Sequence, residues 1–197
     1  ETLDLPYVGV KTPQFSYQRI KGADPIQGVE MAATGEVACI GRDYQEAFFT
    51  SWLATEQKIA GKNILLSIGG DKKEKLFEAI KKLDAAGWNI FTTEGTHDFL
   101  SRRGIATNFL YKASTGNEPN VLSALSGREV DVVINIPRTH AKNNNTDGFA
   151  IRRLAINHHL PAITNLQIAE LFLNCLAEKS VDGITPLSWQ EFTKKFK

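Results

Sequence analysis

The spacing of hydrophobic and polar positions changes near residue 60, where short alternating runs give way to longer apolar runs separated by helical patterns. Before that point the pattern favours three short strands, at residues 7–11, 28–31 and 36–40. Pro13 is expected to end the first strand, and a turn is expected between the other two. A segment of this size encloses little core by itself, so we expect it to belong to a larger unit.

One helix is predicted at the end of this first part. Asp43 stands where an N-cap is expected, because its carboxylate can accept from a free backbone N–H of the first turn. The apolar residues that follow recur on one side at helical spacing, namely Ala47, Phe48, Trp52 and Leu53. The first part therefore consists, by prediction, of short β segments followed by an amphipathic helix.

From residue 61 onward, apolar strands alternate with amphipathic helices, and short links connect them. The strands are expected at residues 63–68, 88–91, 107–111, 131–135 and 161–163. The helices are expected at residues 71–87, 95–103, 119–125, 147–158 and 165–177. Such alternation predicts the α/β class, with a Rossmann-like parallel sheet of about five strands, right-handed crossovers and flanking helices.

Composition narrows the class of protein. The 197 residues are 42% hydrophobic and 23% charged, which is typical of a folded globular chain. The net charge of +1 argues against a general nucleic-acid binder. The apolar runs are far shorter than the roughly 20 residues of a membrane span, and no export signal is recognised. Two cysteines without a spaced framework fit a reducing compartment, so a soluble cytoplasmic protein is expected.

The charge is distributed unevenly between the two parts. Residues 1–60 carry five Lys and Arg against eight acids, whereas residues 61–197 carry 18 against 14. The first part is therefore acidic, at −3, and the second basic, at +4. Because this division coincides with the change in pattern, we place a domain boundary between residues 60 and 61.

Residues suited to an anion follow four of the predicted strands. Lys72 follows the first strand, Thr93 and Thr96 the second, Lys112 the third, and Asn135 with its neighbours the fourth. Ligands of open parallel sheets bind at the carboxyl ends of strands, beside helix N-termini that favour negative charge. Each residue alone has an ordinary explanation, as a helix cap or a solvated lysine. Their convergence on one edge predicts an anion-binding site.

Motifs for other chemistry are missing from the sequence. It contains no CxxC, HExxH, GxSxG or P-loop pattern, so we predict neither catalytic residues nor a metal site. The acids Asp71, Glu94 and Asp98 stand at predicted helix starts, where they suit the helix dipole. The adjacent Arg152 and Arg153 are expected to pair with acids in a structural role.

Two stretches of the chain resemble one known family. The run Val29-Glu-Met-Ala-Ala-Thr-Gly-Glu-Val-Ala38 resembles the end of the second ATP-grasp half of the carbamoyl-phosphate synthetase large subunit. Residues 61–179, which include Gly69-Gly-Asp-Lys72 and Thr93-Glu-Gly-Thr96, resemble the regulatory domain at the C-terminus of the same subunit. That domain has a methylglyoxal-synthase-like fold, so the resemblance implies this fold for residues 61–197 and an ATP-grasp tail for residues 1–60.

The resemblance also implies a function. Enzymes of this family form carbamoyl phosphate from bicarbonate, glutamine or ammonia, and ATP, for pyrimidine and arginine synthesis. ATP and Mg²⁺ or Mn²⁺ belong to the full enzyme; no cofactor is implied for this chain, which is expected to be non-catalytic. The implied partners are a small-molecule effector, the rest of the large subunit and the glutaminase subunit or domain, while a homo-oligomer is a further expectation.

The resemblance extends to the individual residues that bind the effector in this family. Bacterial members bind the phosphate of a nucleotide such as UMP or IMP with residues that match Lys72, Thr93, Thr96 and Lys112. Asn135, Ile136 and Pro137 match the segment along the base or ribose, and the polar residues 138–146 are expected to contact the variable part of the ligand. The implied effector site comprises Lys72, Thr93, Thr96, Tyr111, Lys112, Asn135, Ile136, Pro137 and Arg138.

Three alternatives remain open at this point. Mitochondrial members bind N-acetylglutamate at the same edge; Tyr111 stands at or next to their tryptophan, and Arg138 where an asparagine is expected. A methylglyoxal synthase acting on dihydroxyacetone phosphate shares the fold, but it needs a catalytic aspartate, whereas the corresponding turn carries Glu94. A domain with a vestigial site, serving oligomerisation, is the third alternative.

Overall fold

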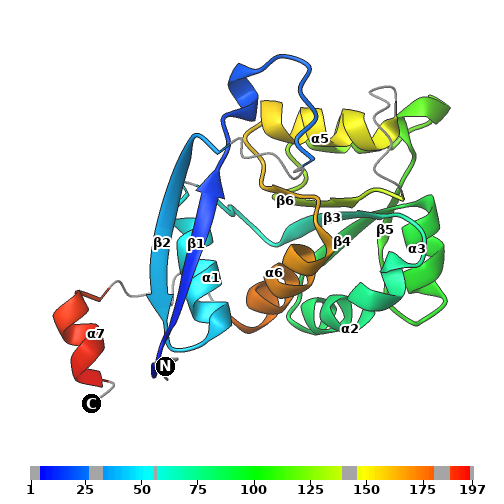
Figure 1. The fold of residues 1–197 in the computed structure, drawn as a ribbon. Helices are drawn as coiled ribbons and strands as arrows, with labels where there is room; N and C mark the ends of the chain where they lie inside the picture. Colours follow the sequence, from blue (N-terminus) through cyan, green and yellow to red (C-terminus); the bar gives the residue numbers. More distant parts are fainter. Residues whose placement is uncertain (1–4, 27–32, 56, 139–145, 180–186, 196–197) are drawn as a thin grey trace.

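A parallel five-stranded sheet forms the centre of the molecule (Figure 1). The computed structural model describes residues 5–26, 33–55, 57–138, 146–179 and 187–195. The strand order is β5-β4-β3-β6-β7, and every neighbouring pair is parallel. The strands are β3 (Asn63–Ile68), β4 (Asn89–Thr93), β5 (Asn108–Leu110), β6 (Val132–Ile136) and β7 (Ala162–Ile163). The predicted parallel sheet of about five strands is confirmed.

Helices cover both faces of this sheet (Figure 1). One face carries α2 (Lys72–Ala85), α3 (Glu94–Ser101) and α6 (Leu166–Glu178). The other carries α4 (Val121–Ser126) and α5 (Asp147–Asn157). The result is the three-layer α/β arrangement that alternating strands and helices predict.

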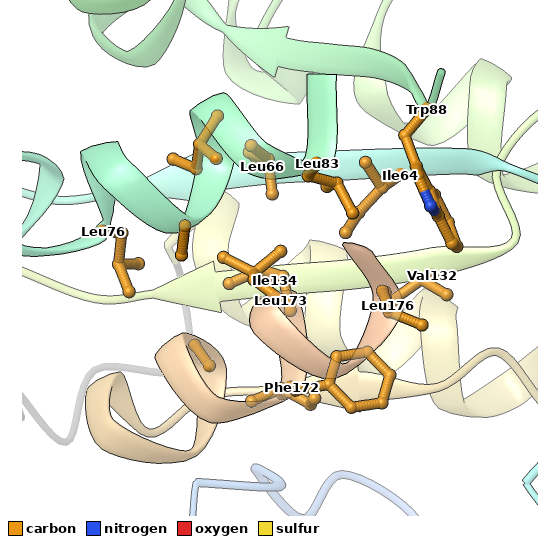
Figure 2. Close-up of a cluster of buried hydrophobic side chains, with 14 of the residues drawn as sticks. Ile64, Leu66, Leu76, Leu83, Trp88, Val132, Ile134, Phe172, Leu173 and Leu176 are labelled. Atoms are coloured by element: carbon orange, nitrogen blue, oxygen red, sulfur yellow. The ribbon is translucent and has the colours of Figure 1, made fainter. Parts of the chain in front are cut away.

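Alternate residues of the central strands enter two separate hydrophobic clusters. Leu66 of β3 and Ile134 of β6 face the helices α2 and α6, where they meet Leu83 and Phe172 (Figure 2). Leu65 of β3 points to the opposite face and joins the cluster beneath α4 and α5. All five side chains are fully buried. Central strands buried on both faces read as continuous apolar runs, which explains why residues 63–68 were recognisable in the sequence.

The N-terminal part forms a β-ribbon backed by a helix. Strands β1 (Val8–Gln14) and β2 (Gly35–Gly41) pair antiparallel, and the short 3-10 helix η1 (Tyr17–Arg19) follows β1. The helix α1 (Tyr44–Leu53) begins at Asp43, whose carboxylate accepts from the Glu46 backbone N–H at 2.7 Å. The predicted N-cap is thus confirmed.

This ribbon and the sheet share one hydrophobic cluster. Trp52 of α1 packs against Phe172 of α6, with ring centroids 4.6 Å apart, and Phe49 lies against both. The helix α7 (Trp189–Lys195) lies beside the start of β1, where the Trp189 ring contacts Tyr7 edge-on at 5.8 Å (Figure 1). The first part therefore buries its apolar helix face against the second part.

Two details of the first part differ from the sequence-based expectation. The prediction that Pro13 ends the first strand is wrong, because β1 continues through Pro13 to Gln14. Proline is tolerated there because β1 lies at the edge of a two-stranded sheet, where a missing N–H need not break a ladder. Residues 36–40 do form a strand, but it pairs with β1; the strand expected at residues 28–31 lies outside the described residues.

The other predicted strands and helices are confirmed, although their first and last residues differ from the predicted ones. The third strand of the sheet, β5, keeps three of the five residues expected at 107–111. The short helices η1, η2 (Ala113–Thr115) and α7 were not predicted, because none carries a full amphipathic period. None of the described helices is long and apolar enough to cross a membrane.

The two cysteines are both free thiols. Cys175 is fully buried in the cluster of α6, and burial raises the pKa of its thiol to about 12. Burial also raises the pKa of Cys39 on β2. Because the thiolate is the reactive form, neither environment favours nucleophilic chemistry.

Candidate functional site

The order of the strands changes direction between β3 and β6. From β3 the chain continues to β4 and β5 on one side, and from β6 to β7 on the other. The segments that leave the carboxyl ends of β3 and β6 therefore diverge, which is the place where open parallel sheets bind ligands. Ser67 of β3 and Asn135 of β6 are paired in register at this point.

Lys72 connects the two diverging segments. It is the first residue of α2, and its ammonium donates to the Pro137 carbonyl oxygen at 2.5 Å and to the Arg138 carbonyl oxygen at 3.3 Å. A flexible lysine held on two backbone carbonyls is positioned without neutralisation of its charge. The structure thus brings together three of the predicted site residues, Lys72, Pro137 and Arg138.

The approach between these segments depends on Gly69. Its backbone N–H donates to the Ile136 carbonyl oxygen at 2.8 Å, which extends the contact between β3 and β6 by one residue. A Cβ atom at this position would lie 2.6 Å from the Arg138 backbone nitrogen. Only glycine accommodates such proximity, so Gly69 allows the Arg138 backbone to lie against the end of β3.

Positive charge accumulates at this edge. The pKa of Lys73 is lowered by burial first and by the charge of Arg138 second, while Asp71 partly opposes the shift. Lys73 donates to the Gly70 carbonyl oxygen at 3.0 Å, so its side chain lies over the same turn. A bound anion would oppose the lowering of the Lys73 pKa, because an opposite charge stabilises the protonated form of a lysine.

A row of polar side chains crosses the face of the sheet that α5 covers. Thr93, the last residue of β4, donates from its hydroxyl to Ser67 Oγ on β3 at 3.3 Å. Asn135 on β6 continues the row and is 3% exposed. Thr93 also occupies the N-cap position of α3, although its side chain makes no capping bond. Two predicted site residues, Thr93 and Asn135, therefore lie in this row.

Thr96 lies on the opposite face of the sheet edge, where its hydroxyl has backbone partners. It accepts from the Ile68 N–H at 3.1 Å and donates to the Ile68 carbonyl oxygen at 3.4 Å. The residue is 1% exposed. The Thr96 side chain therefore connects α3 to the end of β3. This structural role was not part of the expectation that Thr96 contacts a ligand.

Tyr111 and Lys112 mark the end of β5. The Tyr111 backbone forms a parallel bridge with Asn120, and its ring lies edge-on to Phe109 at 4.8 Å. Lys112 is half-buried, and no hydrogen bond or ion pair joins its ammonium to the described residues. Within that part of the chain, Lys112 is thus a cation whose charge is not already engaged.

A small cavity of about 140 Å³ opens next to Lys72. Ile136 and Pro137 line it together with Thr164 and Asn165 at the start of α6. The predicted contact residues Ile136 and Pro137 therefore border a cavity at the carboxyl edge of the sheet. Residues 139–145 of the loop expected to contact the ligand lie outside the described residues.

A larger cavity of about 660 Å³ lies between the ribbon and the sheet. Its wall includes Tyr17 after β1, Trp52 of α1, His159 after α5 and Thr164 after β7. Sequence reasoning missed this cavity, because its wall comes from four segments that are far apart along the chain and carry no shared motif.

Arg152 is a neighbour of the candidate site whose place the sequence did not indicate. It is 3% exposed, and it binds Asp24 of the first part through two hydrogen bonds, at 2.7 and 2.6 Å. Its third contact is with the Asn135 side-chain oxygen, at 2.6 Å. The expectation that Arg152 pairs with an acid is confirmed, but the sequence held no signal that the pair reaches the sheet edge.

Comparison with known proteins identifies the class of this fold. Residues 75–164 match the MGS-like domain family. The chain thus carries an MGS-like domain, and the matched residues include β4, β5, β6 and β7 of the sheet. A crystal structure of methylglyoxal synthase from Elizabethkingia anophelis aligns with a TM-score of 0.46 and 21% identity, covering 57% of this chain and 76% of that chain.

Relatives with curated names place the domain in a longer context. The chain is 41% identical to Multifunctional protein URA2 of Saccharomyces cerevisiae over 90% of its length. It is 34% identical to human mitochondrial carbamoyl-phosphate synthase [ammonia] over 98% of its length. The chain spans 8% and 13% of these two proteins. The resemblance to carbamoyl-phosphate synthetases is confirmed, and this chain corresponds to a small region of such proteins.

Proposed function

We propose that this chain is the allosteric regulatory region of a carbamoyl-phosphate synthetase and binds a phosphorylated nucleotide, such as UMP or IMP, at the carboxyl edge of the sheet. The observation that carries the proposal is the positive edge at the β3–β6 divergence, where Lys72, Lys73 and Arg138 surround the turn after β3. A phosphate group has the charge and the acceptor oxygens that such an edge favours.

The polar row supplies the neutral part of the site. Thr93 and Ser67 offer hydroxyl groups, and Asn135 offers N–H donors, because its oxygen already accepts from Arg152. The N-terminus of α3 begins directly after Thr93 and adds free backbone N–H groups. Together with the unengaged Lys112, these groups suit a ligand that carries a phosphate next to a polar sugar and base.

The proposal extends to the longer protein. That protein forms carbamoyl phosphate from bicarbonate, glutamine or ammonia, and ATP, in pyrimidine and arginine synthesis in the cytoplasm. ATP and Mg²⁺ or Mn²⁺ act in its synthetic domains, and this chain contributes regulation without catalysis. The partners of this chain are then the rest of the large subunit and the glutaminase subunit or domain, and a homo-oligomer is compatible with the same arrangement.

Isothermal titration of the purified chain with UMP, IMP and N-acetylglutamate tests the proposal. We expect one of the nucleotides to bind, and Lys72→Ala to weaken its affinity by about tenfold, since a charge-assisted hydrogen bond contributes roughly 1.5–3 kcal/mol. Lys75→Ala is the matched control, because Lys75 is exposed on the same helix and should leave the affinity unchanged.

Four results would contradict the proposal. The nucleotides could fail to bind, or Lys72→Ala and Lys75→Ala could behave alike. Binding of N-acetylglutamate alone would move the assignment to the mitochondrial type of regulation. Formation of methylglyoxal from dihydroxyacetone phosphate by the purified chain would make it an enzyme instead.

A further inference from the structure

Arg152 holds a buried charge at the junction between the first part of the chain and the sheet. Its Nε and Nη2 atoms donate to the two carboxylate oxygens of Asp24, and its Nη1 atom donates to Asn135 Oδ1. The guanidinium is 3% exposed, whereas the Asp24 side chain is 23% exposed. A buried guanidinium is tolerated only when its donors are paired. A change at Asp24 should therefore alter the contact between Arg152 and Asn135.

The neighbouring Arg153 fastens the same N-terminal segment to α5. Its Nη1 atom donates to the Tyr17 carbonyl oxygen at 3.2 Å and to the Ala23 carbonyl oxygen at 3.1 Å. The Gln18 side chain adds a hydrogen bond to His159 Nδ1 at 2.8 Å. The segment of residues 17–24 is therefore docked along α5, and Asp24 is its contact with the interior.

The contacts that link Asp24 to Arg152 continue to Asn135, which lies at the candidate site. Its side chain stands in the polar row beside Ser67, and its oxygen is occupied by Arg152. Gly148 on α5 covers the pair closely, because a Cβ there would lie 3.0 Å from Arg152 Nη1 and 3.4 Å from Asn135 Oδ1. The orientation of the Asn135 amide is thus set by Arg152, which leaves its N–H donors for a ligand.

We propose that Arg152 is a positioning residue that couples the anion site to the docking of residues 17–24, through the contacts Asn135–Arg152–Asp24. The inference rests on the proposed function, since it names how occupancy of the same site reaches the part of the chain that resembles the synthetase. Ligand at the edge stabilises the docked segment, and loss of Asp24 weakens the ligand, because coupling between two sites is reciprocal.

The first experiment needs no ligand. The side-chain amide resonance of Asn135 is assigned in the ¹⁵N-labelled chain by its loss in Asn135→Asp. We expect Asp24→Asn, which keeps the shape of the side chain but removes its charge, to shift this resonance. Asp43→Asn is the matched control, because Asp43 caps α1 and makes no contact with Arg152. An Asn135 resonance that is the same in both variants would overturn the positioning role.

The second experiment measures coupling to the ligand. UMP and IMP are titrated into the wild type, Asp24→Asn and Asp43→Asn. We expect Asp24→Asn to weaken the better ligand at least about fivefold, the lower range of allosteric coupling. Saturating ligand should also slow hydrogen exchange of the residue 17–24 amides in the wild type. Arg152→Lys keeps the charge but loses the two-pronged geometry, so it should weaken the ligand as well.

The outcomes separate the two proposals. Binding by the wild type with the same affinity in Asp24→Asn would overturn the coupling and leave the proposed function standing. Absence of binding to the wild type would overturn the proposed function and the coupling together. Weaker binding in Asp24→Asn and unchanged binding in Asp43→Asn would support both.

Discussion

The two faces of the sheet differ most at its carboxyl edge. On the face of α2, α3 and α6, the two central strands β3 and β6 stay apolar to their last residues, and Ile68 and Ile136 are almost fully buried. On the face of α5, the last inward positions are the polar residues Ser67, Thr93 and Asn135. In these two strands one face is thus completed by packing, whereas the other ends in hydrogen-bonding groups.

This difference separates residues that look equivalent in the sequence. Thr93 and Thr96 are three positions apart, and both were expected to contact the ligand. Thr93 belongs to the polar face and has a hydroxyl as its partner. Thr96 belongs to the apolar face, where its hydroxyl bonds to the backbone of Ile68. The apolar face should therefore govern stability and the polar face ligand affinity, and the predictions below test that division.

The largest effect is expected from Phe172→Ala on the apolar face. Phe172 is fully buried and packs against Trp52 and Phe49. Removing a buried phenyl ring leaves a cavity and should lower the free energy of unfolding by about 3–5 kcal/mol, measured by urea denaturation. Ile168→Ala on the same helix is the control, because this side chain is 37% exposed and its loss should cost less than about 1 kcal/mol.

Ligand affinity provides the contrast for this variant. The affinity for UMP or IMP, measured under conditions where Phe172→Ala is folded, should remain that of the wild type. A loss of less than about 1 kcal/mol on truncation, or a ligand affinity that falls in proportion to stability, would contradict the division between the faces.

An intermediate effect is expected from Thr96→Val. Valine has the same shape but leaves the buried Ile68 N–H without this acceptor, so the free energy of unfolding should fall by about 1–3 kcal/mol. Thr93→Val removes a longer hydrogen bond, of 3.3 Å to another hydroxyl, and should cost less than about 1 kcal/mol. The order should reverse for ligand affinity, with Thr93→Val the weaker binder. Equal losses of stability in the two variants would remove the distinction.

The central strands and helices were predictable because their signals are local. Residues 63–68 read as a buried strand, and the helix after Asp43 carries its own cap and apolar stripe. Lys72 could be assigned to the candidate site from its position directly after a predicted strand, because a parallel sheet places the carboxyl ends of all its strands on one edge.

The hydrogen-bond partners of the individual candidate site residues could not be predicted from the sequence, because these partners are set by tertiary contacts. Which face Thr96 occupies follows from the packing of α3, and Arg152 meets Asp24 across 128 positions of the chain. Secondary structure at Pro13 could not be predicted locally either. The rule that proline ends a strand does not apply there, because the strand lies at an edge of its sheet. The pairing of distant charges leaves no periodicity from which it can be recognised.

The smallest effect is expected from Asp43, whose polar contact lies at the surface of α1. The hydrogen bond from the Glu46 N–H lowers the pKa of Asp43, and the nearby Lys179 and Arg42 add to the shift. Asp43→Ala should lower the free energy of unfolding by about 1 kcal/mol at neutral pH, the usual contribution of an N-cap. Asp43→Asn should retain most of this contribution, because asparagine is also a strong N-cap residue.

The effect of Asp43→Ala should depend on pH with a definite sign. Because the carboxyl pKa is lower in the folded chain than its ordinary value of 3.8, the unfolded chain binds the proton more readily. The contribution of the carboxylate is then fully present above that value and is lost as the pH falls through the lower, folded-state pKa. Urea denaturation from about pH 7 to pH 3 should show the difference between wild type and variant shrinking toward acid. A difference that grows toward acid would mean that Asp43 stabilises the chain through its protonated form, which is the opposite of what the lowered pKa of its carboxyl predicts.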